Sequence, residues 1–156
     1  MMDRKNLDLF ITAAEEIFKE TGFLNLEIDD CNIKKQKHEL VANIGITGEI
    51  SGFLLIRSDI PSSIAFIAKM QSNMGMKPQE SDFCQFHKET FGEILNQISG
   101  RTMMLLEDHG INCNITPPTI LRGHNISIST YDAAELLHKT IKGSFGYFDL
   151  LIGAKE

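Results

Sequence analysis

The sequence has no tryptophan, only four prolines and only three cysteines among its 156 residues. Cys31, Cys84 and Cys113 are odd in number and widely spaced, which argues against both a disulfide framework and a zinc site. The chain also lacks an apolar run near the roughly 20 residues that a membrane-spanning helix needs, and its polar start, Asp3 to Asn6, is unlike the apolar core of a signal peptide. We therefore expect a cytoplasmic protein that does not associate with membranes.

Basic residues are in the minority. The chain has 15 lysines and arginines against 21 acidic residues, a formal net charge of −6 and a pI near 5.3. A nucleic-acid-binding protein needs a basic stripe that neutralises phosphates, and none is present, so nucleic acid is not expected as a partner. With 42% hydrophobic residues and a length that suits one core, the chain is predicted to form a single domain over residues 1–156.

Familiar catalytic motifs are absent as well. The sequence contains no Walker-type phosphate loop, no dinucleotide-binding fingerprint and no nucleophile elbow. Its five histidines form no H-E-x-x-H metal-binding pair, and Cys84 near His87 has no visible third group to complete a nucleophilic site. We therefore predict neither a cofactor nor a metal of the protein's own.

Periodic patterns predict an α+β fold. Apolar residues at helical spacing predict helices over 6–20, from 60 to about 70, and over 82–110. Pro117 and Pro118 exclude helix and mark extended chain. Alternating residues predict a short strand within 23–28, a hairpin of 40–46 and 51–56, a strand at 125–131, and a closing hairpin of 136–142 and 147–152. The sum is a mainly antiparallel sheet with helices packed on one face.

The predicted helix 82–110 has two contrasting faces. At about 100° per residue, its core-facing arc is Phe83, Phe91, Ile94, Leu95, Ile98, Leu105 and Leu106. The opposite arc carries Glu93 and Asn96, with Gly92 and Gly100 four residues to either side of Asn96. Each glycine costs a helix roughly 0.5–1 kcal/mol relative to alanine. The face is either a plain solvated surface with tolerated glycines or a surface that another molecule approaches closely.

The segment from Gly92 to Arg101, GEILNQISGR, resembles the Glu-x-x-Asn signature of the CheC/CheX/FliY phosphatases of bacterial chemotaxis. The amphipathic first helix, the hairpin around residues 48–52 and the closing strands also resemble the CheX pattern. CheX is the nearer relative, because CheC-type members usually have a second signature on the first helix and residues 15–19 here contain no asparagine. The departures are modest: Gln97 and Glu89 stand where methionine and aspartate are common.

This resemblance implies a CheX/CheC-like fold and a phosphatase that hydrolyses the phosphoaspartate of a CheY-like receiver domain. Asn96 is then expected to orient the in-line water, and Glu93 to pair with the receiver's lysine. Magnesium is expected in the receiver and not in this chain. The residues expected to contact the receiver are Glu89, Gly92, Gly100 and Met103.

Two alternatives stay open. In the first, the protein is a catalytically silent CheX-like module that binds a receiver or another flagellar or chemotaxis partner. In the second, it is an unrelated α+β domain that binds a small ligand and has the signature by accident. The resemblance also implies a homodimer, because CheX-like proteins pair through sheet edges. The segment from Phe145 to Ala154 has few charges and is expected to provide such an edge.

Overall fold

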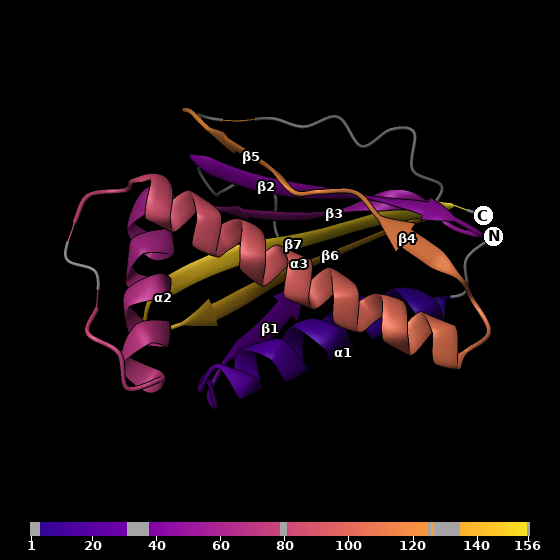
Figure 1. The fold of residues 1–156 in the computed structure, drawn as a ribbon, viewed down its shortest axis with the longest axis horizontal. Coiled ribbons are helices and arrows are strands. Elements are labelled where there is room, and N and C mark those ends of the chain that lie inside the picture. Colours follow the sequence, from indigo (N-terminus) through magenta and orange to yellow (C-terminus); the bar gives the residue numbers. More distant parts are fainter. Residues whose placement is uncertain (1–3, 31–37, 79–80, 125, 127–134, 156) are drawn as a thin grey trace.

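The computed structural model describes residues 4–30, 38–78, 81–124, 126 and 135–155 (Figure 1). Its helices are α1 (Arg4–Glu20), α2 (Ile60–Asn73) and α3 (Gln85–Asp108). Its strands are β1 (Glu27–Asp30), β2 (Leu40–Gly48), β3 (Ser51–Ser58), β4 (Cys113–Ile115), β5 (Thr119–Arg122), β6 (Glu135–Gly143) and β7 (Gly146–Lys155). No helix in this described part is both long enough and apolar enough to cross a membrane.

The strands form one sheet in the order β1-β6-β7-β3-β2-β4, and β5 pairs with the other half of β2. Every pairing is antiparallel. Both predicted hairpins are confirmed, as β2–β3 and β6–β7. The second arm of the first hairpin, β3, lies between β2 and β7, so it is a central strand as its apolar sequence indicates.

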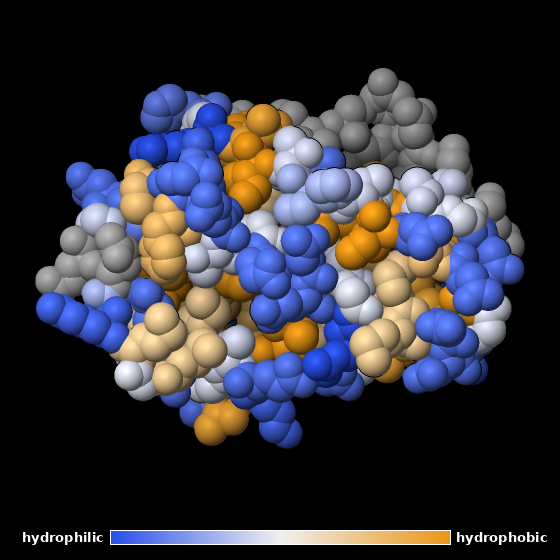
Figure 2. Space-filling view, viewed as in Figure 1, coloured by the Kyte–Doolittle hydropathy of each residue, from blue (hydrophilic) through white to orange (hydrophobic). Residues whose placement is uncertain are grey.

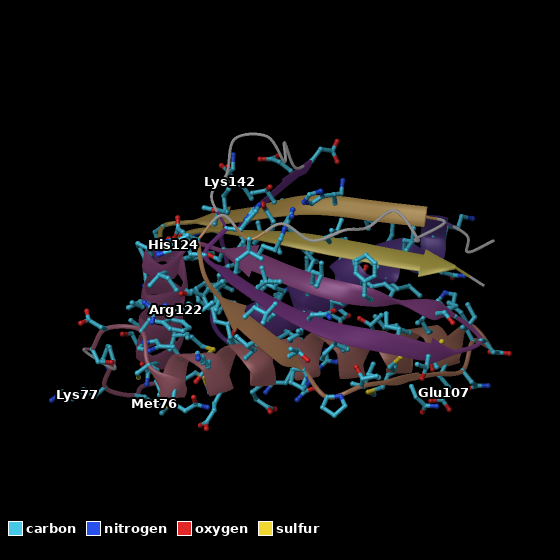
Figure 3. The ribbon with its side chains drawn as sticks, turned by 90° about the horizontal axis from the view of Figure 1, so that it is seen from above. Met76, Lys77, Glu107, Arg122, His124 and Lys142 are labelled. Atoms are coloured by element: carbon cyan, nitrogen blue, oxygen red, sulfur yellow. The ribbon has the colours of Figure 1, made fainter. Side chains whose placement is uncertain are left out.

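All three helices cover the same face of the sheet. Leu40, Ala42 and Ile44 of β2 belong to the main core cluster with residues of α1, α2 and α3. Val41 and Leu55, which point the other way, belong to a small separate cluster without helical residues. Figure 3 shows the sheet from above, with α3 along one side of it. The predicted α+β class, with helices on one face of a mainly antiparallel sheet, is confirmed.

Local signals set the helix ends. Asp59 precedes α2 in an extended conformation, and its Oδ1 accepts a hydrogen bond from the Ser62 N–H at 2.7 Å, with Pro61 in the first turn. The chain leaves α1 through Gly22, whose φ of 92° favours glycine. The start of α2 and the end of α1 lie close to the predicted positions because these two caps are encoded locally.

Several predicted boundaries shift. Helix α3 begins at Gln85 and not at Asp82, because the preceding Cys84 is extended. The first strand starts only at Glu27. The strand predicted at 125–131 lies outside the described residues, apart from residue 126. Strands β4 and β5, which flank Pro117 and Pro118, were predicted only as extended chain.

Strand β7 is not a sheet edge. It pairs with β3 on one side and with β6 on the other. The prediction that residues 145–154 provide an edge for dimerisation is therefore wrong. The segment has few charges because it is buried on both faces: Leu150 and Ile152 face the helices, and Leu151 contributes to the small cluster behind the sheet. Low charge here marks a central strand.

A buried polar cluster lies on the far face of the sheet. The carboxylate of Asp149 accepts a hydrogen bond from Thr140 Oγ1 at 2.8 Å, and its Oδ2 lies 3.4 Å from His38 Nε2 and 3.9 Å from Arg57 Nη2. Arg57 Nη2 also lies 2.8 Å from His138 Nε2. Because an arginine nitrogen only donates, His138 Nε2 has to accept, so this imidazole is neutral. Burial, and then the charge of Arg57, lowers the pKa of both His38 and His138.

We expect stability to fall when the pH is lowered below about 6.5, the ordinary pKa of histidine. In this pH range the histidines bind protons in the unfolded chain but not in the folded cluster. The free energy of unfolding therefore decreases until the pH reaches the lower folded-state pKa values. Urea unfolding at pH 7.5 and pH 5.5 measures this loss. A His138→Gln variant, which keeps an acceptor for Arg57, should lose less stability than the wild type.

The matched control is His124→Gln, because His124 is exposed. This control should show the full wild-type loss. Equal losses in both variants would mean that His138 does not contribute to the pH dependence.

Candidate functional site

Helix α3 buries one stripe of side chains in the main core. Its buried apolar residues are Phe91, Ile94, Leu95, Ile98 and Leu106, all members of the predicted arc. Phe83 is also buried but precedes the helix, and Leu105 is only partly buried. Because the residues of this stripe recur every three or four positions, the opposite arc has to face outward.

The first turn of α3 is tied to β5. The Cys84 backbone N–H donates to His87 Nδ1 at 3.0 Å, so that nitrogen is an acceptor, and burial lowers the pKa of His87. The Phe83 ring stacks on His87 with centroids 5.4 Å apart, and the guanidinium carbon of Arg122 lies 5.2 Å above Phe83. Figure 3 shows Arg122 at this end of α3 and Glu107 at the other.

The second half of α3 is tied to α1. Arg101 Nη1 lies 2.8 Å from Glu16 Oε2, and Arg101 Nη2 lies 2.7 Å from Glu20 Oε1. One guanidinium thus bridges two carboxylates of the neighbouring helix, which opposes rotation of α3 about its own axis. The helix is held at both ends while its outer face stays open.

Glu93 and Asn96 lie on that outer face, one turn apart. Residues at this spacing are neighbours on a helix, with Cβ atoms about 5–6 Å apart. Glu93 is exposed, and its Oε1 accepts from Gln97 Nε2 at 3.5 Å. Asn96 is half-buried, and its carboxamide makes no hydrogen bond to any other residue that the structure describes. Both groups are therefore available to a molecule that docks on α3.

A shallow groove of about 350 Å³ runs beside this pair. We call it the α3–β5 groove; its lining residues are Gln85, Lys88, Glu89, Gly92, Glu93, Asn96, Pro118 and Ile120. One wall is the polar side of α3, and the other is apolar and comes from β5 and the residue before it. In the space-filling view, a hydrophobic patch lies over β5 next to hydrophilic side chains of α3 (Figure 2).

The two helical glycines have different surroundings. A Cβ at residue 92 would lie 3.3 Å from Ile120 Cδ1 and 3.5 Å from Pro118 Cγ. The close approach at Gly92 is therefore made by the protein's own chain. A Cβ at Gly100 would meet nothing within 4 Å. Only Gly100 leaves open space beside Asn96 for another molecule.

The other two residues predicted to contact the receiver, Glu89 and Met103, also differ in their surroundings. Glu89 lines the α3–β5 groove, and its Oε1 accepts from Gln85 Nε2 at 3.3 Å. Met103 is half-buried and packs against the main core, whereas its neighbour Met104 is 62% exposed. Sequence reasoning missed the apolar wall of the groove, although Pro118 had marked that segment as extended.

Among the residues that the structure describes, no group of three or more histidine, cysteine, aspartate or glutamate side chains is placed to hold a metal ion.

Solved structures with the same fold come from chemotaxis proteins. A CheC-like superfamily protein from Shewanella sp. PV-4 superimposes with a TM-score of 0.80 at 19% identity, over 99% of this chain and 100% of that chain. A chain of the CheX–CheY–BeF3–Mg2+ complex from Borrelia burgdorferi gives a TM-score of 0.79 at 22% identity, over 97% of this chain and 98% of that chain. These likenesses define the fold as that of the CheC-like proteins.

Sequence comparison identifies the family. The family model for the chemotaxis phosphatase CheX matches residues 40–142, and this chain belongs to the CheX family. The curated CheY-P phosphatase CheX of Thermotoga maritima is 32% identical over 94 residues, which are 60% of this chain and 58% of that protein. The resemblance to CheX is thus confirmed, and both Glu93 and Asn96 lie inside the segment that the family model matches.

The surroundings of the glycines predict the stability of two variants. Gly100→Ala should raise the free energy of unfolding by roughly 0.5–1 kcal/mol, because alanine is the better helix former and its methyl group meets no neighbour. Gly92→Ala should gain less, because Ile120 has to move. Urea denaturation followed by circular dichroism measures both changes. An equal gain in the two variants would show that β5 does not press on α3 at Gly92.

Proposed function

We propose that this protein is a phosphatase that accelerates hydrolysis of the phosphoaspartate in a CheY-like receiver domain. Membership of the CheX family supports the class of reaction. The observation that carries the mechanism is the half-buried Asn96 carboxamide, which has no hydrogen-bond partner among the described residues and lies one turn from an exposed carboxylate.

Asn96 acts on the attacking water. In a phosphorylated receiver, the receiver's own magnesium ion and lysine bear the negative charge of the transition state, so the missing component is a water held in line with the leaving oxygen. A carboxamide can accept from that water and donate to it or to the phosphoryl group. Because it does not ionise, it does not compete with the water as a nucleophile.

Glu93 anchors the receiver. Its carboxylate lies one turn before Asn96 on the same exposed face, where it can pair with the ammonium group of the receiver's lysine. This ion pair fixes how deeply α3 enters the receiver's active site and so sets the position of the Asn96 carboxamide. Gly100 has space for the receiver surface, and Glu89 lies on the same side of the helix.

The remaining components are assigned to the receiver and the cell. The magnesium ion belongs to the receiver; the related Borrelia burgdorferi complex contains CheX, CheY, BeF3 and Mg2+. We place the activity in the cytoplasm, where the kinases that phosphorylate receivers use ATP. This protein supplies two side chains and a rigid helix.

Replacement of Asn96 should separate binding from turnover. Asn96→Ala should change the free energy of unfolding by no more than about 0.5 kcal/mol, as is usual for surface changes. It should slow accelerated dephosphorylation by about 10²-fold or more, because a misplaced reactant alone costs that much. The assay follows the decay of each receiver from the same genome after phosphorylation with acetyl phosphate. Asn114→Ala, at an exposed amide on β4, is the matched control.

Glu93→Gln should instead weaken both binding and turnover. Loss of a desolvated charge partner costs on the order of 2–5 kcal/mol of binding free energy. The control is Glu107→Gln, at an exposed acid far along α3, which should not change binding.

Full activity of Asn96→Ala on a receiver that the wild type dephosphorylates would overturn the water-positioning role. A wild type that binds a receiver without accelerating its decay would identify the silent binding module.

We also infer that the protein forms a homodimer, as the CheX resemblance implies. Since β7 is central, the pairing has to use a surface other than residues 145–154. Multi-angle light scattering at micromolar concentration should give twice the 17.5 kDa mass of one chain. A mass of one chain under these conditions would contradict the inference.

A further inference from the structure

The apolar wall of the α3–β5 groove is built by a bulge in the sheet. Asn43 of β2 pairs with Thr119, and Ile46 pairs with Ile115. Between these two pairs, two residues of β2 lie opposite three residues of the segment that joins β4 to β5, residues 116–118. Such an extra residue bends an edge strand and redirects its side chains. Proline is tolerated there because a bulge at an edge needs fewer backbone donors.

The bulge is fixed from both sides. The Gly45 N–H donates to Thr116 Oγ1 at 2.8 Å, and the Thr116 N–H donates to the Gly45 carbonyl at 2.9 Å. Beyond it, β5 pairs with β2, and Arg122 closes over Phe83 at the start of α3. The wall is therefore preorganised and does not have to be ordered when a partner binds.

We propose that this wall is a second receiver-binding element, and that the α3–β5 groove takes an apolar side chain of the receiver that lies next to its phosphoaspartate. The proposal rests on the proposed phosphatase function. Glu93 and Asn96 themselves line the groove, so a receiver seated on this pair also covers the groove. Pro118 and Ile120 are then specificity-determining residues that contact the partner but not the reacting atoms.

The chemistry of the groove selects this occupant. Pro118 and Ile120 offer no polar side-chain atom, so a polar group lying against them would lose its water without a hydrogen bond in return. The opposite wall contains two carboxylates, Glu89 and Glu93, and one ammonium group, Lys88, so the groove is not a basic pocket built for an anion. A volume of about 350 Å³ is at the lower end of ligand sites, which span roughly 300–1,000 Å³, and is large enough to hold one side chain.

The test compares two neighbours on β5. Ile120 faces α3 and partly packs against the main core, whereas Leu121 is 52% exposed. Ile120→Ala should raise the KM for a phosphorylated receiver by roughly tenfold, the lower end of the effect of a lost methylene in an apolar pocket, and should leave kcat unchanged. Leu121→Ala should change neither constant. Asn96→Ala, by contrast, should lower kcat.

Two further variants keep the test valid if Ile120→Ala is poorly folded. Pro118→Ala shortens the other side chain of the wall and should also raise KM. Ile120→Met conserves volume and apolar character and should retain most of the wild-type affinity. Unchanged KM values for both Ile120→Ala and Pro118→Ala, with an active wild type, would overturn the proposal. A wild type that dephosphorylates no receiver would overturn the proposed function and this inference with it.

Discussion

The burial of one stripe of α3 against the sheet decides what the outer face of this helix can do. Phe91, Ile94, Leu95 and Ile98 are all within the main core. Burial of each large apolar side chain contributes roughly 1.5–3 kcal/mol, so any rotation of α3 that exposed them would be strongly opposed. With that stripe fixed, helical geometry leaves Asn96 and its acidic neighbour on the opposite side. The site is held in place by the core and needs no network of its own.

Strong local periods explain which parts of the fold could be predicted from the sequence. The two hairpins alternate clearly or are apolar throughout, and α2 has its cap at Asp59. The pair Glu93 and Asn96 was recognisable for the same reason: the apolar positions between and around it fix the phase of the helix. A structural feature that is set by residues a few positions apart can therefore largely be predicted from a single sequence.

The remaining features depend on pairing between distant residues. Nothing near Gly92 in the sequence indicates that Ile120 fills the space above it, so a close approach was recognised but its source was not. The few charges of β7 indicate burial, but they do not say whether another strand or another molecule provides it. Strands β4 and β5 are short, and their existence depends on a long neighbour, β2, that offers both halves of its edge.

The bulge at residues 116–118 also makes chain length in this loop a determinant of recognition. Side chains of a strand alternate between its two faces, so a shift of one residue in the pairing turns every side chain of the strand over. If this segment lost one residue and still formed a bulge of three residues opposite two, β5 would shift by one residue against β2, and Leu121 would take the place of Ile120 in the groove. Relatives that differ in this way would present a differently shaped apolar wall beside an unchanged Glu-x-x-Asn pair, and under the receiver-binding role that we propose for the wall their partner preference would change without any substitution in α3.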